Sequence, residues 1–546
     1  MEARRASRWV EPLALVSLAL LVRVPGLDRR PLWLDEACNV LFARRGLLEV
    51  LDAVRWEGNP PLYYWLLGLW TEVLGDSEWA VRALPLLFGV LSVVSTWRTA
   101  RALFPGSRHA AWIAGLLVAL SPLHAYYSRE GRVYTLTTLV ASELLLALHR
   151  ALDRGVWRDW LRVSAWLVTG LYAHNYALFL LPVVPLTALV TVPADQRRRA
   201  LVGAVASVAT AALVYLPWVP TLLFQLQSGV GSWVGRLFSL VPAWRHPFAS
   251  MEAMGVGGVF PPYLGELSQL PEGLSLGSAS WSVLRWTGVA LLTLGLGSVA
   301  VSRRALSAVG PSITRVALFG LLPLAIPYVW SLLASPIYLV GRYELPSLVA
   351  LALLLGASAD MQLRSSSVTR RRATGAVLAL WVVAAALVLI ALHRAPVSLL
   401  ERTVARILVD HATAADVIVF PDTTRAVPEY YLGRASNAAA RVSFPPEQSA
   451  HPGWIDPHAR LSEPAELVET AQRTARRLRE HVEVSGGTVY VVDWNRQPPL
   501  PALNVVLHRA LQAELGPESI AFMPHPHAGP YLTLFAPRQN RDGLPR

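Results

Sequence analysis

The chain has 546 residues, of which 53% are hydrophobic and only 16% are charged. Such a composition is too apolar for a soluble enzyme and indicates a polytopic membrane protein. The formal net charge is +12, and all the Lys+Arg positions are arginine. Because these arginines gather between apolar segments, as in cytoplasmic loops, nucleic-acid binding is a poor explanation of the charge. The single cysteine, Cys38, excludes an intrachain disulfide and a cysteine-based metal site.

The first apolar segment, residues 13–27, follows an arginine-rich start and predicts a signal-anchor helix with its N-terminus in the cytoplasm. No small-x-small cleavage pattern follows it. We therefore expect residues 28–80 to form a first external loop. Two amphipathic segments within it, 36–54 and 61–74, predict interfacial helices. The second is too short to cross a bilayer, and its tyrosines and tryptophans suit the headgroup level.

Arginine clusters alternate with the later apolar segments and set the remaining topology. Spans are predicted at residues 83–97, 111–123, 133–148, a pair within 163–192, 201–216, 283–301, 316–333, 345–355 and 376–392. With the signal anchor this gives about eleven spans and places the C-terminus outside. The Gly/Pro/aromatic stretch 217–282 is too long for an ordinary connection and predicts a second large external loop. Residues 1–395 are thus expected to form one transmembrane domain.

The composition of the chain changes beyond the last predicted span. The apolar runs 417–420, 488–492 and 531–535 predict short buried strands, and residues 465–481 predict a helix with arginines on a solvated face. This tail of about 150 residues is long enough for one small α/β domain. We therefore expect residues 396–546 to form a soluble extracytoplasmic domain.

Two adjacent carboxylates, Asp35 and Glu36, stand a few residues beyond the first predicted span. Carboxylates this close to a bilayer are costly to place and therefore point to a function. One of them suits a general base that takes a proton from an attacking hydroxyl group. The simpler alternative is an interfacial helix start, in which Asp35 caps the helix and Glu36 favours its positive end.

Further polar groups meet the acidic pair at the same face of the membrane on this topology. Arginines at the mouth of apolar helices suit a phosphate, because guanidinium offers a fixed fork of donors and stays charged when partly desolvated. Phosphate binding and hydroxyl activation, with no nucleotide motif, predict a polyprenyl-phosphate sugar as donor and a one-step displacement with inversion. The candidate binding residues are Asn59, Arg129, Arg132, Tyr134, His174, Arg342 and Tyr343.

Four motifs stand in a recognisable order in the first third of the chain. They are Leu34-Asp35-Glu36, Asn59-Pro60-Pro61-Leu62-Tyr63-Tyr64-Trp65, Gly75 with Arg82-Ala83-Leu84-Pro85, and Tyr127-Ser128-Arg129-Glu130-Gly131-Arg132-Val133-Tyr134. This order resembles the GT-C glycosyltransferases, in the branch of the protein O-mannosyltransferases and aminoarabinose transferases (glycosyltransferase families 39 and 83). The resemblance covers residues 13–148, is looser through Tyr343-Glu344-Leu345-Pro346, and does not extend into the C-terminal tail.

The resemblance implies roles for single residues. Asp35 falls on the family's catalytic aspartate in the first external loop, and Arg132 and Tyr134 match positions near the donor phosphate. Arg342 matches an arginine that often precedes the late Tyr-x-x-Pro. Two positions depart from the pattern. Asn59, which cannot carry charge, stands where the family usually has His or Lys. Arg129 stands where Gln is commoner, and it restores the positive charge that Asn59 lacks. Some relatives bind a metal near the site, which leaves a divalent metal open as a cofactor, but no ligand set is evident in this sequence and no metal-ligating residues are predicted.

Together the residues and the resemblance predict a GT-C type membrane glycosyltransferase with Asp35 and Glu36 as catalytic residues. It would act on the outer face of the cytoplasmic membrane, among membrane lipids, on a hydroxyl of a lipid, a polysaccharide or a protein. The chief alternative is a transporter or flippase of lipid-linked sugar, which would use the same arginines without a base; repeated or broken helices in two halves would favour it. A third reading is a non-catalytic assembly partner whose C-terminal domain binds cell-wall glycan.

Overall fold

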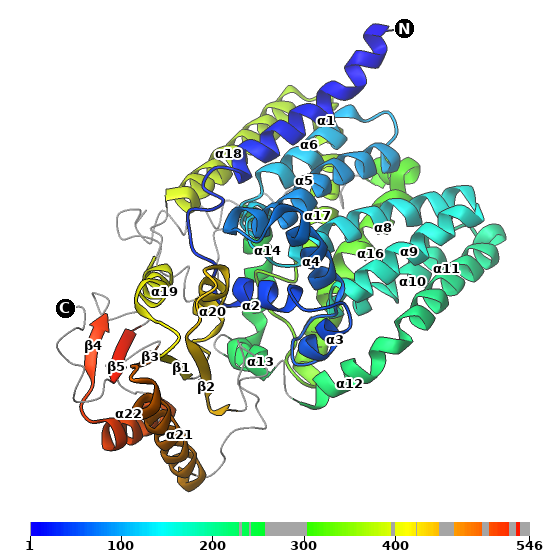
Figure 1. The fold of residues 1–546 in the computed structure, drawn as a ribbon. Coiled ribbons are helices and arrows are strands. Elements are labelled where there is room, and N and C mark those ends of the chain that lie inside the picture. Colours follow the sequence, from blue (N-terminus) through cyan, green and yellow to red (C-terminus); the bar gives the residue numbers. More distant parts are fainter. Residues whose placement is uncertain are drawn as a thin grey trace.

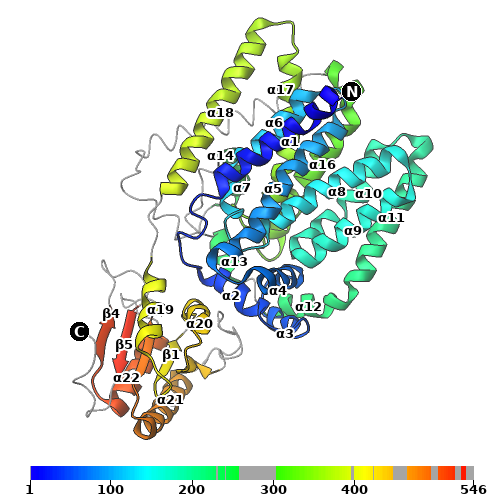
Figure 2. The same cartoon turned by 45° about the horizontal axis from the view of Figure 1, so that its top comes forward.

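The computed structural model is mostly helical and has two parts, a bundle of helices and a small β-sheet with its own helices (Figures 1 and 2). The structure describes residues 2–228, 232–239, 242–256, 303–394, 399–421, 423–446, 464–493, 502–522 and 531–535. The predicted span 283–301 and much of the predicted second external loop lie outside these residues.

Six helices of the described part are long and apolar enough to cross a membrane, and all six overlap predicted spans. They are α5 (Glu78–Leu103), α8 (Tyr134–Arg154), α11 (Ala194–Tyr215) continued by η2 (Leu216–Trp218) and α12 (Val219–Gln227), α16 (Arg303–Leu333), α17 (Leu345–Leu363) and α18 (Val368–Arg394). The other described helices at predicted spans are α1 (Glu2–Arg23), α6 (Arg108–Leu120), α9 (Trp157–Ala173), η1 (Asn175–Leu180) and α10 (Val183–Thr191). These helices are too short or not apolar enough to be identified as membrane spans by themselves, so the total of about eleven spans stays a prediction.

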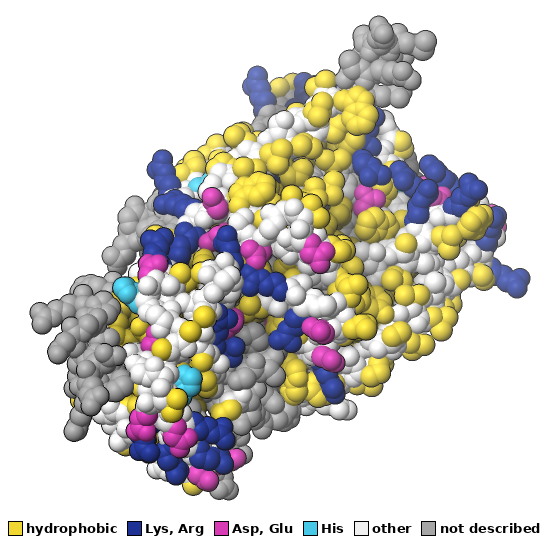
Figure 3. All heavy atoms as spheres, viewed as in Figure 1, with side chains coloured by type: hydrophobic (Ala, Val, Ile, Leu, Met, Phe, Trp, Pro, Cys, Tyr) yellow, Lys and Arg dark blue, Asp and Glu magenta, His cyan; other side chains and the backbone are white. Residues whose placement is uncertain are grey.

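Exposed apolar side chains cover the bundle. Figure 3 shows hydrophobic side chains over much of the bundle on one face, and charged side chains over the sheet with its helices and at one end of the bundle. Leu21 of α1 and Leu87 and Leu91 of α5 are among the exposed large hydrophobic residues. Long apolar helices that expose such side chains are suited to lipid rather than water. The chain is a multi-pass membrane protein.

Small and hydroxylic residues hold the helices of the bundle together. Ser95 of α5 donates a hydrogen bond to Ser142 of α8 at 2.9 Å, and Thr99 donates to the Ser142 carbonyl oxygen at 3.3 Å. Gly356 of α17 lies so close to α6 that a Cβ atom there would stand 2.5 Å from the Ala110 carbonyl oxygen. Close approach at small residues and interhelical hydrogen bonds are the usual means of helix association in lipid.

Short helices follow α1, as the two amphipathic segments predict. They are α2 (Leu34–Ala43), α3 (Glu49–Val54) and α4 (Leu62–Leu74). With 13 residues, α4 is too short to span a bilayer. The remaining short helices of the bundle are α7 (Pro122–Tyr127), α13 (Ser232–Ser239), η3 (Ala243–Arg245) and α14 (His246–Val256).

The sheet has the strand order β2-β1-β3-β5-β4. Its strands are β1 (Val417–Pro421), β2 (Ala440–Phe444), β3 (Val489–Asp493), β4 (Ser519–Phe522) and β5 (Tyr531–Phe535). The first three in this order are parallel, and β5 runs antiparallel to both β3 and β4. β1, β3 and β5 match the three predicted strands. β2 and β4 are additional; both are short, carry polar residues and lie at the edges.

Alternate residues of β1 face opposite layers of helices. Val417 and Val419 pack with α21 (Pro464–Ser485) and α22 (Ala502–Leu515), whereas Ile418 and Phe420 pack with α19 (Leu400–His411). This alternation follows from the two-residue period of a strand. The remaining helix, α20 (Ala426–Arg434), also packs into the buried cluster that contains α2 and α4. The division into domains at residue 395 stays a prediction.

Candidate active site

Most of the predicted site residues meet where α2, the start of α8 and the link before α17 come together. Asp35 lies in the first turn of α2, but the N-cap position belongs to Trp33, so Asp35 does not cap the helix. Its Oδ2 atom lies 3.4 Å from Nη2 of Arg132. Nη1 of Arg132 donates to Asn39 at 3.2 Å, and Asn39 donates to the Gly131 carbonyl oxygen at 2.7 Å. One face of α2 thus holds Arg132 through two side chains a helical turn apart.

Tyr134 lies between two arginines. The guanidinium carbons of Arg132 and Arg342 each lie 5.9 Å from the centroid of its ring, and Arg342 donates to the Tyr134 hydroxyl at 3.3 Å. Both arginines are buried. An aromatic face stabilises such cations, more so when they are desolvated. Two guanidinium groups therefore share a buried region with the Asp35 carboxylate, an arrangement suited to an anion.

Aromatic rings continue from Tyr134 into a small pocket. The ring of His174 lies 6.2 Å from that of Tyr134 and 5.2 Å from that of Tyr343, and Tyr176 lies 4.4 Å from Tyr343. These four rings and Arg342 line the pocket, and its other walls are mainly apolar. The pocket therefore pairs a polar, aromatic side with an apolar one.

His174 is neutral at physiological pH. Burial, reinforced by the charge of Arg132, lowers the pKa of His174 to about 3. Its Nδ1 atom accepts a hydrogen bond from the Tyr176 backbone N–H at 3.0 Å, so Nε2 carries the ring proton. The imidazole can donate a hydrogen bond to a ligand but is not a store of positive charge.

Glu36 is fully buried and bound by protein groups on both oxygens. Arg82 donates to Oε1 at 2.8 Å and to Oε2 at 2.5 Å. The backbone N–H groups of Gly131 and Trp33 donate to Oε1 and Oε2 at 2.7 and 3.3 Å. Burial alone would raise the pKa of Glu36, but the charge of Arg82 outweighs it and the pKa is lowered. The other N–H groups of Arg82 donate to the backbone carbonyl oxygens of Leu27, Arg30 and Pro31.

Arg129 does not join this cluster. Its Nη2 atom donates to the carbonyl oxygens of Pro25 and Gly26 at 2.8 and 3.0 Å, and its Nη1 atom lies 2.7 Å from Nδ1 of His393 in α18. The structure thus brings Arg132 to Asp35 but turns Arg129, three residues earlier, toward the ends of α1 and α18.

Asn59 is buried and forms a side-chain hydrogen bond with Tyr64 of α4. Asn39 and Arg82 are not among the site residues predicted from the sequence. Asn39 follows Asp35 by four residues, the spacing that places two side chains on one helix face, so the signal was present. Arg82 belongs to one of the four motifs, but its neighbours in sequence do not indicate that Glu36 is its partner.

Several buried polar atoms around Arg132 have no hydrogen-bond partner within the described ranges. They are Nε of Arg132, the hydroxyls of Tyr63 and Tyr127, and Oε2 of Glu130. Buried polar groups are normally satisfied, so such a group of atoms is expected where a ligand or ordered water binds. As for metals, the described residues include no group of three or more His, Cys, Asp or Glu side chains that could hold an ion.

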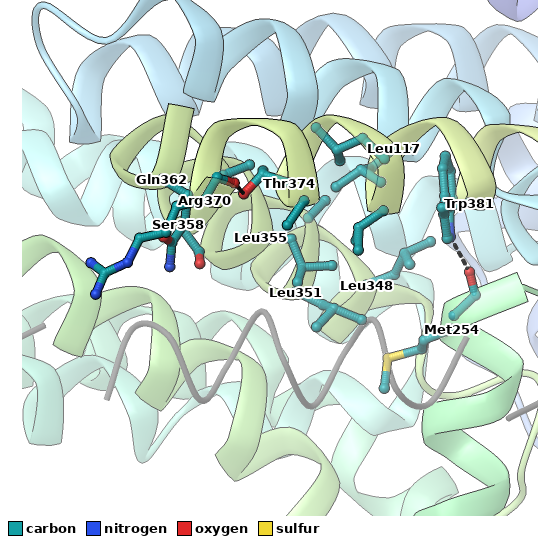
Figure 4. A pocket seen from close by; sticks show the side chains of 16 residues that line it. Leu117, Met254, Leu348, Leu351, Leu355, Ser358, Gln362, Arg370, Thr374 and Trp381 are labelled. Atoms are coloured by element: carbon teal, nitrogen blue, oxygen red, sulfur yellow. Dashed lines mark hydrogen bonds between the residues drawn. The ribbon is translucent and has the colours of Figure 1, made fainter. Parts of the chain in front are cut away.

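A separate cavity of about 290 Å³ lies between α17 and α18 (Figure 4). Apolar side chains make up most of its walls, Arg370 stands at one end, and Trp381 at the other donates to the Gly255 carbonyl oxygen at 2.6 Å. None of the predicted site residues lines it. The cavity is therefore not part of the candidate active site.

Comparison with known sequences identifies similar sugar transferases. Residues 58–241 match the family model described as dolichyl-phosphate-mannose-protein mannosyltransferase. The chain is 30% identical over 228 residues to the undecaprenyl phosphate-alpha-4-amino-4-deoxy-L-arabinose arabinosyl transferase of Pseudomonas aeruginosa (strain UCBPP-PA14). That alignment covers 39% of this chain and 40% of the relative, so the chain matches less than half of the relative's length.

Comparison with solved structures extends over nearly the whole chain. ArnT from Cupriavidus metallidurans in the apo state superposes with a TM-score of 0.57 at 15% identity, covering 97% of this chain and 98% of ArnT. The same protein bound to undecaprenyl phosphate gives a TM-score of 0.54 at 16% identity, with the same coverage. The apo Archaeoglobus fulgidus oligosaccharyltransferase gives 0.53 at 12% identity, covering 89% and 69%. The fold is that of GT-C glycosyltransferases, and the resemblance that the motifs predict is confirmed.

The Arg82–Glu36 pair leads to a first prediction. Arg82→Gln leaves the Glu36 carboxylate buried without its charge partner, which we expect to lower the free energy of unfolding by about 3–5 kcal/mol. Arg98 lies on the same helix, but its side chain is 46% exposed in its ion pair with Glu143, so Arg98→Gln should cost less than about 1 kcal/mol. Thermal unfolding of the two detergent-solubilised variants tests this. Equal, small losses would contradict it.

Glu130 leads to a prediction on pH. Burial raises the pKa of its carboxyl from 4.5 to about 7, against the opposing charges of Arg342 and Arg30. The folded chain thus holds this proton more tightly than the unfolded chain, and Glu130 lowers stability as pH rises through about 7. Since a glutamine stays neutral, the melting temperature of Glu130→Gln should rise relative to wild type between about pH 5 and about pH 8. The exposed Glu49→Gln is the control. A difference independent of pH would refute the assignment.

Proposed function

We propose that this protein is an inverting glycosyltransferase that moves a sugar from a polyprenyl phosphate to a hydroxyl group. The main observation behind this proposal is that the Asp35 carboxylate and two buried guanidinium groups, those of Arg132 and Arg342, come together around Tyr134. This brings a candidate base and a candidate phosphate site together, beside the pocket that Tyr134 and Arg342 line. The named activity of the arabinosyl transferase relative and the undecaprenyl phosphate bound to ArnT support the same reaction class.

The donor phosphate is assigned to Arg132 and Arg342. Arg132 retains a buried Nε–H without a protein partner in the described part of the chain. Guanidinium groups bind phosphate oxygens through paired, charge-assisted hydrogen bonds and keep their charge when partly desolvated. The neutral His174 and the ring of Tyr343 flank this position and offer a hydrogen-bond donor and a flat face to the sugar.

The base is assigned to Asp35. Its carboxylate accepts the proton of the acceptor hydroxyl while the hydroxyl oxygen attacks the anomeric carbon. The bond from that carbon to the phosphate oxygen breaks, and the arginines stabilise the negative charge on the departing phosphate. Because a single displacement occurs, the anomeric centre is inverted. We assign Glu36, whose oxygens are all taken by Arg82 and backbone N–H groups, to positioning rather than proton transfer.

We place the site on the extracytoplasmic face of the cytoplasmic membrane. α8 begins at Tyr134 in the site and ends at Arg154, and α17 begins just beyond Tyr343 and ends before Arg364. The arginine-rich ends of these helices thus lie opposite the site. Cytoplasmic loops carry an excess of arginine, which supports an external site. The acceptor hydroxyl belongs to a lipid, a glycan or a protein.

Replacement of Asp35 tests the base. Asp35→Asn should lower transfer by at least about 100-fold, because an amide cannot accept the proton, while membrane insertion and donor binding persist. Asp52→Asn, at an exposed position of α3, should retain activity. The product is measured by mass spectrometry of envelope glycans and lipids. The strain used lacks its own copy of the protein and carries either variant or wild type in its place. Full activity of Asp35→Asn would refute the role and favour a lipid-linked sugar flippase.

Replacement of the arginines tests the phosphate assignment. Arg132→Ala and Arg342→Ala should each weaken binding of undecaprenyl phosphate by about 10- to 100-fold, the loss expected for hydrogen bonds to a charged group. Arg129→Ala should change it little, because that side chain binds Pro25 and Gly26. Titration of the purified protein with undecaprenyl phosphate measures all three. An unchanged affinity in Arg132→Ala would show that the phosphate binds elsewhere.

A further inference from the structure

Two helices of the C-terminal part contact the bundle: α20 lies against α2, the short helix that carries Asp35, and α19 reaches Glu78 at the start of α5. Ala426, Val427 and Tyr430 of α20 belong to the same buried cluster as Phe42 of α2 and Tyr64 of α4. Figures 1 and 2 both show α20 beside α2. About 390 residues of sequence separate the two helices, so this contact is purely tertiary.

Hydrogen bonds reinforce this packing at the link between α4 and α5. The Tyr430 hydroxyl donates to the Asp76 carbonyl oxygen at 2.7 Å. The Tyr431 hydroxyl donates to Oε1 of Glu78 at 2.9 Å, and Arg402 of α19 donates to the same oxygen at 3.0 Å. Together with Arg434 we call these C-terminal residues, Arg402, Tyr430, Tyr431 and Arg434, the α20 clamp.

Ion pairs and cation–π contacts complete the α20 clamp. Arg434 lies 3.4 Å from Oδ1 of Asp76 and 3.5 Å from Oε2 of Glu78. On the other side of Asp76, Arg44 at the end of α2 forms an ion pair with Oδ2. The guanidinium groups of Arg44 and Arg434 each lie 5.6 Å from the ring centroid of the fully buried Tyr430. An isolated surface pair contributes little, but pairs joined in a network around a buried ring hold one geometry.

The clamped link governs both ends of α2. Asp76 holds Arg44 at the C-terminal end of α2. Glu78 starts α5, and one turn later Arg82 binds Glu36 at the N-terminal end of α2, next to Asp35. We infer that the α20 clamp positions α2, and thereby holds the Asp35 carboxylate in register with Arg132. The C-terminal part then serves the transfer reaction by positioning, without touching substrate; this inference rests on the proposed function.

The experiment compares clamp variants with a matched arginine outside the clamp. Arg434→Ala and Tyr431→Phe weaken the clamp, and Arg434→Lys keeps its charge. Arg479→Ala is the control: its side chain is 41% exposed, against 37% for Arg434, and pairs with Glu514 inside the C-terminal part. Hydrogen exchange of α2, transfer in membranes and binding of undecaprenyl phosphate are measured on the full-length protein.

We expect faster exchange of α2 in Arg434→Ala and Tyr431→Phe than in wild type or Arg479→Ala. Transfer should fall about tenfold in these two variants, because a small displacement of a catalytic group is costly, while undecaprenyl phosphate binding is unchanged. Arg434→Lys should recover most of the activity. If Arg434→Ala does not fold, Tyr431→Phe, which lacks only one hydroxyl, decides the test.

Three results overturn the inference. The first two are wild-type exchange of α2 in the clamp variants and wild-type transfer in them. A fall in transfer that Arg479→Ala reproduces also overturns it, because the effect would then be general destabilisation. Failure of the proposed function is distinguishable. In that case wild type itself shows no transfer from a polyprenyl-phosphate sugar, while the exchange of α2 still reports whether the clamp holds the helix.

Discussion

The buried ion pair of Arg82 and Glu36 is the constraint on which the candidate site depends. Glu36 adjoins Asp35, so fixing one carboxylate fixes the backbone that carries the other. Arg82 also satisfies backbone carbonyl oxygens of residues 27–31, a stretch without a helix or strand to bind them. Because desolvation offsets much of the attraction, such a pair adds little net stability. We interpret it as a device that selects one arrangement of the loop, since other arrangements would bury a charge unpaired.

The fold was predictable wherever a segment's own residues decide its state. The apolar runs 345–355 and 417–420 form a helix and a strand. They were predictable because consecutive apolar side chains favour burial wherever the segment packs. Edge strands β2 and β4 were not predictable, since β2 carries Arg441 and Ser443 and is defined by its pairing with β1. Helix ends shift for a similar reason: α16 begins at Arg303, well before the predicted residue 316, because helical backbone continues into a polar segment.

The site was predictable by residue type but not by orientation. Asp35 and Glu36 are consecutive on a helix and point in directions about 100° apart, so only one can face Arg132 while the other meets Arg82. Which one does so depends on α5, which the local sequence does not place. Arg129 and Arg132 pose the same problem in a non-helical link, and there the positions of Pro25, Gly26 and His393 distinguish them. Motifs name the candidates, and packing between distant segments assigns the roles.

The length of α2 explains why the site draws on the whole chain. A helix of ten residues is marginal in isolation, so its position must come from contacts with other elements. Ala37, Cys38 and Phe42 lie on the buried face of α2. Their apolar contacts keep the helix from sliding only if both ends of the helix are also fixed. Arg82 fixes one end and Asp76 the other, and both lie at the junction of α4 and α5. A candidate catalytic carboxylate on a short helix therefore draws its support from inside the bundle and from the C-terminal part, which together reach across nearly four hundred residues of sequence.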